Sequence, residues 1–324
     1  MPISHAPSDL AIVTCYFNSE NYETKLNNYR AFKSNLMRIG LPCFTVECTF
    51  GEGLFVLEGD VLRVQARDVM WQKERLLNLA IQALPGRFTK VAWLDCDLLF
   101  QDDDWAQNTS RLLDKCTVVQ PFKWVVRLPR GHTSYLGEGE KWKSFGAVYK
   151  KDKKALLGGR FDAHGHTGFA WAARREVLAE HGLYDACIAG SGDHMIAHAV
   201  CGDHRSICID RIIGRNSAYR RSFEDWATRL ASATQGRLGY VPGTLLHLWH
   251  GDIINRRYVD RNRELEQFSF DPHQDLQLGP TGCWEWTART PQLRDWAIRY
   301  FSSRREDGED QPAPASLSRA ATKH

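Results

Sequence analysis

Long apolar runs are absent from this sequence. No apolar stretch approaches the ~20 residues that a helix needs to span a bilayer. Residues 1–5 also lack the charged and apolar regions of a secretory signal. Both features argue against membrane-spanning and secreted classes of protein. We therefore expect a protein without a transmembrane segment that is made and kept in the cytoplasm.

Closely paired cysteines are also missing. The nine cysteines include no C-x-x-C pair, their number is odd, and most lie inside apolar runs such as residues 11–17. This pattern argues against a disulfide framework and is typical of a reduced protein. A chain of 324 residues is long enough to bury its core without cross-links.

The chain has little net charge of either sign. Its 42 Lys and Arg stand against 39 Asp and Glu, a formal charge of +3, which by itself indicates neither a nucleic-acid nor an anionic-membrane partner. Residues 123–160 differ, because ten Lys and Arg there face three acids and lie among aromatics such as Trp142. We interpret residues 123–165 as a mobile basic loop, which suits a lid over a diphosphate more than a stacking surface for a nucleic acid.

Strand patterns alternate with helical patterns along most of the chain. This alternation predicts an α/β fold with a mostly parallel sheet flanked by helices, whose ligand sites lie at the carboxyl ends of the strands. We expect one domain over residues 1–304, made of the halves 10–121 and 122–304. The Gly-, Asp-, Pro- and Ser-rich residues 305–324 are predicted to be disordered. The predicted strands cover residues 10–17, 43–50, 61–65, 90–94, 117–121, 168–173 and 244–249, and the main helices cover 22–39, 70–84, 174–181, 193–201, 223–233, 256–268 and 291–304.

An acidic motif, Asp95-Cys96-Asp97, follows the predicted strand at residues 90–94. Apolar residues on both sides bury the segment around its two carboxylates. A turn after the strand brings both acids to one ion, and carboxylates are the ligands that hard cations prefer. Because unpaired buried carboxylates are costly, we expect Mg²⁺ or Mn²⁺ as their partner. In the alternative interpretation, an aspartate only caps the turn.

Two histidines, His247 and His250, end the strand predicted at residues 244–249. An imidazole in this position supplies a nitrogen ligand to the same ion. His250 is the better candidate because it lies beside the Gly-Asp loop that follows. The alternative is a histidine whose hydrogen bonds are satisfied within the core.

A loop of small residues, Gly190-Ser191-Gly192, delivers Asp193 to the start of a predicted helix. Asp193 fits either an N-cap or a general base that its small neighbours leave accessible to a substrate hydroxyl. We favour the general base.

The helix predicted over residues 70–84 carries Lys73 and Arg75 just before the strand with the acidic motif. These cations suit a diphosphate. A solvated charged turn is an equally good interpretation of the same residues.

His194 and His198 are four residues apart and share a helical face, and His204 follows them. Their spacing imitates a zinc site. Met195 stands where the zincin signature has glutamate, which leaves a zinc hydrolase as a remote alternative.

The order of these motifs resembles the β-1,4-galactosyltransferase-like GT-A glycosyltransferases. That family carries a basic helix with Leu-Leu-Asn, a D-x-D strand end, a glycine-containing acceptor strand, an acidic Gly-Gly-Glu-Asp segment and a downstream histidine. In this chain the resemblance spans roughly residues 10–265. The matching segments are residues 71–78, 93–98, 166–170 and 190–193, followed by His250.

The resemblance implies a Rossmann-like GT-A fold and inverting transfer of a hexose from a nucleotide diphosphate sugar, UDP-linked by family habit, to an acceptor hydroxyl. It implies Mn²⁺ or Mg²⁺ held by Asp97, His250 and Asp95, with Asp193 as the base. Residues 10–121 would then bind the donor. By the same resemblance the donor-binding residues are Thr14, Tyr16, Lys73, Asn78 and Asp95, and the acceptor-binding residues are Gly168, His194 and Trp142.

The segment from Gly190 to His194 departs from the family pattern, because it lacks the glutamate and the second aspartate. The acceptor therefore stays open among a glycan, a lipid-linked saccharide, a protein and a nucleic acid. Two other functions fit the same acids and histidines. One is a metal-dependent phosphoesterase or nucleotidyltransferase, and the other is a catalytically silent sugar- or nucleic-acid-binding module of the same fold.

Overall fold

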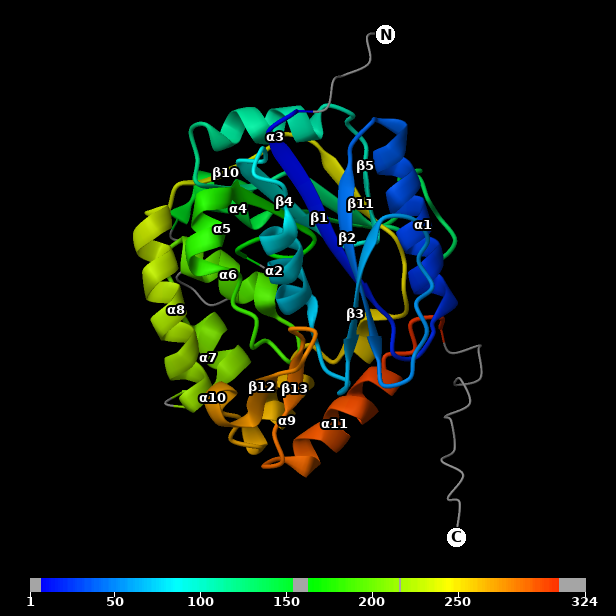
Figure 1. Ribbon diagram of the computed structural model, residues 1–324. Helices are drawn as coiled ribbons and strands as arrows, with labels where there is room; N and C mark the ends of the chain where they lie inside the picture. The colour runs from blue at the N-terminus through cyan, green and yellow to red at the C-terminus, as the bar shows by residue number, and fades with distance from the viewer. Residues whose placement is uncertain (1–6, 154–162, 216, 309–324) are drawn as a thin grey trace.

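A seven-stranded sheet forms the centre of the molecule (Figure 1), for which a computed structural model describes residues 7–153, 163–215 and 217–308. All its strand pairs are parallel except those of β9, which runs antiparallel to both of its neighbours. The predicted mostly parallel α/β sheet is thus confirmed. In spatial order the strands are β10 (Leu238–Tyr240), β6 (Val118–Gln120), β9 (Ala170–Arg174), β4 (Lys90–Leu94), β1 (Leu10–Phe17), β2 (Cys43–Phe50) and β3 (Val61–Ala66).

Helices cover both faces of this sheet, which explains why its central strands β1 and β4 are buried along their whole length. Along β1, Leu10 and Ile12 pack into the core beneath one layer, whereas Ala11 and Val13 pack into the other. Each fully buried large apolar side chain contributes about 1.5–3 kcal/mol to the stability of this arrangement. One face carries α1 (Glu23–Arg38) and α3 (Trp105–Leu113), and the other carries α2 (Lys73–Ala83), α5 (Arg175–His181), α6 (Gly192–Val200) and α8 (Ala218–Thr234).

The acidic motif lies where the order of the sheet reverses. Strand β4 lies next to β1 on the side opposite β2, so the crevice beyond the carboxyl ends of β1 and β4 is a topological switch point. Open α/β sheets bind their ligands at such points. Asp95 and Asp97 follow β4 directly and therefore lie at this crevice.

A second sheet brings His247 to the same place. It contains β5 (Leu98–Phe100), β11 (Thr244–His247), β7 (Trp124–Arg127) and β8 (Glu140–Lys143), in that order. Because β5 begins immediately after the acidic motif and pairs antiparallel with β11, His247 lies opposite Leu98. The backbone N–H of Leu248 also donates to the carbonyl of Asp97 over 2.9 Å.

The remaining elements gather mostly at the end of the molecule toward which β1 runs. Figure 1 shows α9, α10, α11, β12 and β13 at the bottom of the view. The remaining elements are α4 (Phe145–Lys151), α7 (Ile207–Ile213), η2 (Ile253–Arg256), α9 (Asp260–Gln267), α10 (Pro272–Asp275), β12 (Leu276–Leu278), β13 (Trp284–Trp286) and α11 (Pro291–Ser302).

Among the described residues, no helix combines the length and the apolarity that crossing a membrane requires.

The segment predicted to be a mobile basic loop has regular structure over much of its length. It contains β7, β8 and α4, and its basic side chains lie mainly on exposed positions of these elements. Ser144 caps α4 by accepting a hydrogen bond from Ala147 over 3.2 Å, and Phe145 is fully buried. The prediction was wrong here because the high charge of the segment suggested a loop. In the structure β7 pairs with β11, a strand that is distant in sequence. Residues 154–162 of the segment lie outside the described residues.

The start of the predicted disordered tail is also packed. Asp307 accepts hydrogen bonds from the backbone N–H groups of Glu23 and Thr24, over 3.0 and 2.7 Å. It therefore caps the N-terminus of α1, whose own N-cap residue makes no side-chain cap bond. Glu306 is 2% exposed. The prediction was thus wrong for residues 305–308, and residues 309–324 lie outside the described residues.

Candidate active site

A cavity of about 890 Å³ opens at the carboxyl ends of β1 and β4. Its size falls within the ~300–1,000 Å³ of small-molecule and cofactor sites. Eight basic and six acidic side chains line the cavity, so part of its wall suits a charged or polar ligand. These charged residues are Lys25, Lys73, Arg127, Arg211, Arg256, Arg261, Arg263 and Arg304, with Asp95, Asp97, Asp193, Asp210, Glu266 and Glu306.

Asp97, His247 and His250 form a compact cluster in this cavity. Asp97 Oδ2 lies 2.9 Å from His250 Nε2 and 3.6 Å from His247 Nε2, and the two Nε2 atoms are 3.2 Å apart. One ligand atom from each residue lies within 4.8 Å of the others. Within the described part of the chain, Asp97 Oδ1 is buried without a hydrogen-bond partner. A carboxylate and two imidazoles with one orphaned oxygen fit a divalent cation such as Mn²⁺.

Protonation states favour the same use of the cluster. Burial by itself raises the pKa of Asp97, but His247 and His250 hold that pKa well below its usual range, so the carboxylate stays ionised. Burial lowers the pKa of His247 to about 4, which keeps this imidazole neutral near pH 7. Metal ions bind the ionised carboxylate and the neutral imidazole.

Glu306 orients His250 by contacting Nδ1, the ring nitrogen that does not face Asp97. Its Oε2 lies 3.3 Å from His250 Nδ1, while Arg304 donates to its other oxygen over 2.5 Å. A carboxylate that accepts from the far nitrogen of a histidine is the common outer partner of metal-ligating imidazoles. Arg256 Nη2 lies 2.7 Å from His250 Nε2, a contact that a cation would replace. Arg256 is thereby placed for an anionic group beside the cluster.

Lys73 joins two further carboxylates that line the cavity. Its Nζ lies 2.6 Å from Asp95 Oδ1 and 2.8 Å from Asp193 Oδ2. Burial opposes its charge, but these two acids raise the pKa of Lys73 well above the usual range. Burial also raises the pKa of Asp95 to about 7, against the effect of Lys73. Asp95 therefore pairs with a lysine in this structure, whereas Asp97 alone joins the histidines.

The loop before Asp193 needs its small residues for close packing. A Cβ atom on Gly192 would lie 2.1 Å from Glu74 Oε1, and one on Gly190 would lie 3.1 Å from Arg261 Nη2. Ser191 adopts a left-handed φ of 73° between them. Glu74 packs closely against Gly192 at the start of α6. This contact holds the loop in the position in which Asp193 lines the cavity.

Glu74 is a buried acid that the sequence analysis did not single out. Burial raises the pKa of Glu74 to about 8, although Lys73 opposes this shift and Asp193 and Asp95 reinforce it. Glu74 also contributes to a raised pKa of the nearby Cys187 thiol, after the larger effect of burial. Glu74 is therefore largely protonated at neutral pH, in contrast to Asp97.

Replacing Glu74 by glutamine is expected to change how stability depends on pH. The folded chain keeps a proton on Glu74 that the unfolded chain loses above its ordinary pKa of 4.5, so this residue costs stability as pH rises from about 4.5 to about 8. Relative to wild type, Glu74→Gln should gain a few kcal/mol over that interval. Urea unfolding of both proteins at a series of pH values measures the difference. A difference that stays constant with pH would contradict the assignment.

Two of the three predicted acceptor residues line the cavity, and the third lies elsewhere. Gly168 and His194 line the cavity, and a Cβ atom on Gly168 would lie 3.8 Å from Asp193 Oδ2. Trp142 does not line it, because it lies on β8, partly exposed at 37% and paired with β7. His166 lines the cavity as well, and burial together with Arg127 holds its pKa well below the usual range.

Three predicted donor residues lie outside the cavity wall. Thr14 is fully buried and donates to the carbonyl of Leu94 over 2.7 Å. Tyr16 is 3% exposed and packs against Tyr29. Asn78 ties α2 to the segment after α5, accepting from Leu183 N over 2.8 Å. The structure thus gives these polar groups internal partners, and of the five predicted donor residues only Lys73 and Asp95 line the cavity.

Arg75 likewise points elsewhere. It pairs with Asp185 over 3.2 Å and donates to the carbonyl of Gly282. The basic pair predicted on this helix is therefore split, with Lys73 in the cavity and Arg75 in a structural contact. The cavity's other cations, such as Arg256 and Arg304, come from segments that carried no motif.

No protein-family model matches the sequence, and no curated protein matches it. The chain is similar to solved structures of low identity. A Drosophila β-1,4-galactosyltransferase 7 mutant, solved with manganese, UDP-Gal and xylobiose, is 10% identical, with a TM-score of 0.40 over 89% of this chain and 98% of that chain. Glucosyl-3-phosphoglycerate synthase of Mycobacterium tuberculosis is 11% identical, with a TM-score of 0.39 over 80% and 78% of the chains.

A third similar structure is a putative nucleotide-diphospho-sugar transferase from Desulfovibrio desulfuricans. It is 9% identical to this chain, with a TM-score of 0.35 over 81% of this chain and 95% of that chain. At such identities and TM-scores the likeness assigns neither a residue nor a substrate to this chain.

Proposed function

We propose that the chain is a metal-dependent glycosyltransferase that uses a nucleotide diphosphate sugar. The observation that carries this proposal is the layout of one cavity. In this cavity Asp97, His247 and His250 form a cation-type cluster, and Lys73 holds Asp193 at the start of α6. A cation site for a diphosphate and a positioned carboxylate for a hydroxyl are the two requirements of sugar transfer.

Donor binding is assigned to this cluster. Asp97, His247 and His250 would hold Mn²⁺ or Mg²⁺, which when bound neutralises the charge of the diphosphate. Arg256, beside His250, and Arg304 would donate hydrogen bonds to phosphate oxygens from the same side. We propose a UDP-linked hexose as the donor, in line with the family that the motifs resemble.

Asp193 is proposed as the general base. Its carboxylate would accept the proton of the acceptor hydroxyl as that oxygen forms a bond to the anomeric carbon and the bond to the diphosphate oxygen breaks. Attack from the face opposite the leaving group inverts the anomeric centre. Lys73, 2.8 Å from Asp193 Oδ2, fixes the direction of the carboxylate. Gly168 leaves space in front of it for the acceptor, whose class stays open.

A donor panel tests the proposal. The full chain is incubated with UDP-, GDP- and other nucleotide-linked hexoses, with Mn²⁺ or with a chelator, and the release of nucleoside diphosphate is measured. We expect slow, metal-dependent release from one donor without any acceptor. Cleavage of phosphate esters, with no release from any sugar nucleotide, would overturn the proposal in favour of a phosphoesterase. Metal-dependent binding of a donor without release would identify a silent binding module.

Replacing Glu306 by glutamine is expected to weaken metal binding, and thermal unfolding is followed in parallel because Arg304 loses the charge of its buried partner. Loss of the carboxylate behind a metal-ligating histidine commonly lowers metal affinity by about 10–100-fold. The Mn²⁺ concentration that gives half-maximal donor hydrolysis should therefore rise by a similar factor in Glu306→Gln. Asp307→Asn is the matched control, because Asp307 caps α1 and does not contact His250. An unchanged Mn²⁺ requirement in Glu306→Gln would remove this role from Glu306.

A further inference from the structure

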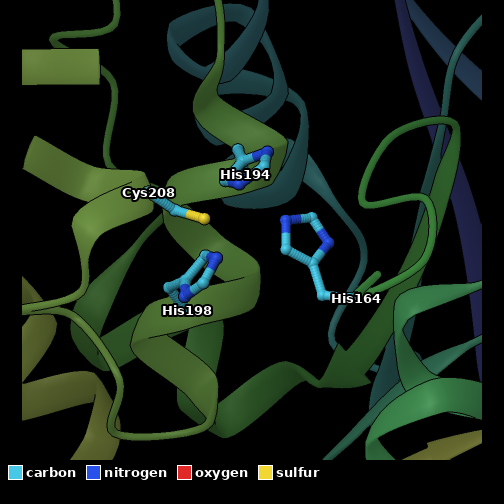
Figure 2. Close-up of side chains that lie close together, drawn as sticks. All are labelled: His164, His194, His198 and Cys208. Carbon is cyan, nitrogen blue, oxygen red and sulfur yellow. The ribbon is translucent and has the colours of Figure 1, made fainter. Parts of the chain in front are cut away.

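A second cluster of metal-ligating side chains lies beside the cavity, on the side of α6. It consists of His164, His194, His198 and Cys208, and one ligand atom from each lies within 4.8 Å of the others. Figure 2 shows the three imidazoles and the thiol directed toward a common centre. The two helical histidines come from α6, Cys208 comes from α7, and His164 comes from the segment that precedes β9.

The hydrogen bonds of two imidazoles fix which nitrogen has a lone pair. His164 Nδ1 lies 2.8 Å from the carbonyl oxygen of Gly165, and His198 Nδ1 lies 2.9 Å from Asp203 Oδ2. Carbonyl and carboxylate oxygens only accept, so both Nδ1 atoms carry the proton and both Nε2 atoms keep a lone pair. Among the described residues, His198 Nε2 is buried and has no hydrogen-bond partner.

The third imidazole, His194, lies beside a hydroxyl, which can donate or accept and so does not fix its tautomer. His194 Nδ1 lies 3.3 Å from Thr167 Oγ1, and burial with three nearby histidines holds the pKa of His194 well below its usual range. A neutral imidazole is the form that binds a metal ion. Cys208 is fully buried and free of any disulfide.

The donor set selects the kind of ion. Three imidazoles and one thiolate are borderline-soft ligands, which favour zinc over Mg²⁺ or Mn²⁺, and four protein ligands complete the tetrahedron of a structural zinc site. The charges also balance, because one thiolate and the carboxylate of Asp203 together match a divalent cation. Asp203 stands behind His198 as the outer carboxylate that zinc-binding histidines commonly have.

We propose that His164, His194, His198 and Cys208 bind a structural zinc ion. The ion would join α6, α7 and the segment from His164 to Gly168, which forms part of the cavity wall. Since His194 follows Asp193 directly, the same ion would hold the start of α6 in place. This site differs from the zinc interpretation of the sequence, because His204 is not a member of the cluster and lies 3.4 Å from Thr228 Oγ1.

Metal analysis of the full chain tests the proposal without any assay of activity. The chain is expressed in zinc-containing medium, purified without added metal, passed over a chelating resin and analysed for metals by mass spectrometry. We expect about one zinc ion per chain in wild type and in Asp97→Asn, which alters only the other cluster. In Cys208→Ala the zinc content should fall at least several-fold, whereas Cys201→Ala should keep it, because Cys201 caps the C-terminus of α6 and is not a member of the cluster.

Cobalt substitution identifies the ligands. When Co²⁺ replaces the zinc, wild type, Asp97→Asn and Cys201→Ala should show the near-ultraviolet charge-transfer band of a cobalt–thiolate bond. If Cys208→Ala does not fold, His198→Gln provides a second variant, which should weaken binding of the ion. Absence of zinc from wild type, together with no thiolate band after addition of Co²⁺, would overturn the proposal. Failure of the donor panel alone would leave it standing, since it concerns a different cluster.

Discussion

Asp97→Asn should abolish metal-dependent donor binding and lower the rate of donor hydrolysis by about 10³-fold or more. The substitution keeps the size of the side chain but removes the charge that lies 2.9 Å from His250 Nε2. It also places an uncharged amide beside the two imidazoles, which then lack the carboxylate that completes the cation site. The measurement is the rate of nucleoside diphosphate release as a function of Mn²⁺ concentration.

Asp103→Asn is the matched control for this variant. Asp103 pairs with Arg38 at the surface and lies outside the cavity wall. It should retain the wild-type rate and Mn²⁺ dependence. If Asp97→Asn hydrolyses the donor as Asp103→Asn does, the cluster with His247 and His250 is not the metal site of the enzyme.

Asp193→Asn should keep donor binding but lower transfer by about 10²–10⁴-fold, the contribution of a positioned general base. The amide cannot accept the acceptor's proton, whereas Asp97, His247 and His250 keep their side chains. The measurement pairs binding of the nucleoside diphosphate with the rate of product formation, using the acceptor or water. Lys73 would lose one of its two carboxylate partners, so thermal unfolding is followed at the same time.

Asp225→Asn serves as the control for the second variant, because Asp225 is exposed on α8. Equal turnover of Asp193→Asn and Asp225→Asn would remove the base role from Asp193. Loss of donor binding in Asp193→Asn would instead place the residue in the donor site.

The sequence predicted the parts of the fold and site that depend on local pattern. Strand β4 is apolar and ends at an acidic motif, so both its burial and its position at the edge of the sheet follow from neighbouring residues. The same holds for the loop before Asp193, whose glycines mark a backbone that needs space. The structure supplies the reason for one of them, the close approach of Glu74 to Gly192.

Parts of the site that depend on distant packing could not be predicted. Glu306 lies in a segment whose composition is typical of disorder, and its burial follows from Arg304, Lys25 and His250, the last 56 residues away in sequence. The zinc-type cluster required α7, a short helix that was not predicted, to bring Cys208 beside α6.

Polar residues on buried strands and helices were the other source of error. Thr14 and Asn78 have the residue types and the positions of ligand-binding groups, but their hydrogen bonds are internal. A sequence does not distinguish a polar side chain that satisfies a neighbouring backbone group from one that faces a ligand. Only the three-dimensional arrangement separates the two.

Calorimetric titration of uridine diphosphate into the wild-type chain, with Mn²⁺ and with a chelator, tests the central claim most directly. The account predicts binding in the presence of Mn²⁺ that is lost with the chelator and in Asp97→Asn. Binding of equal strength with and without the metal would contradict it. Absence of binding by uridine diphosphate and by every other nucleoside diphosphate, at saturating Mn²⁺, would contradict it as well.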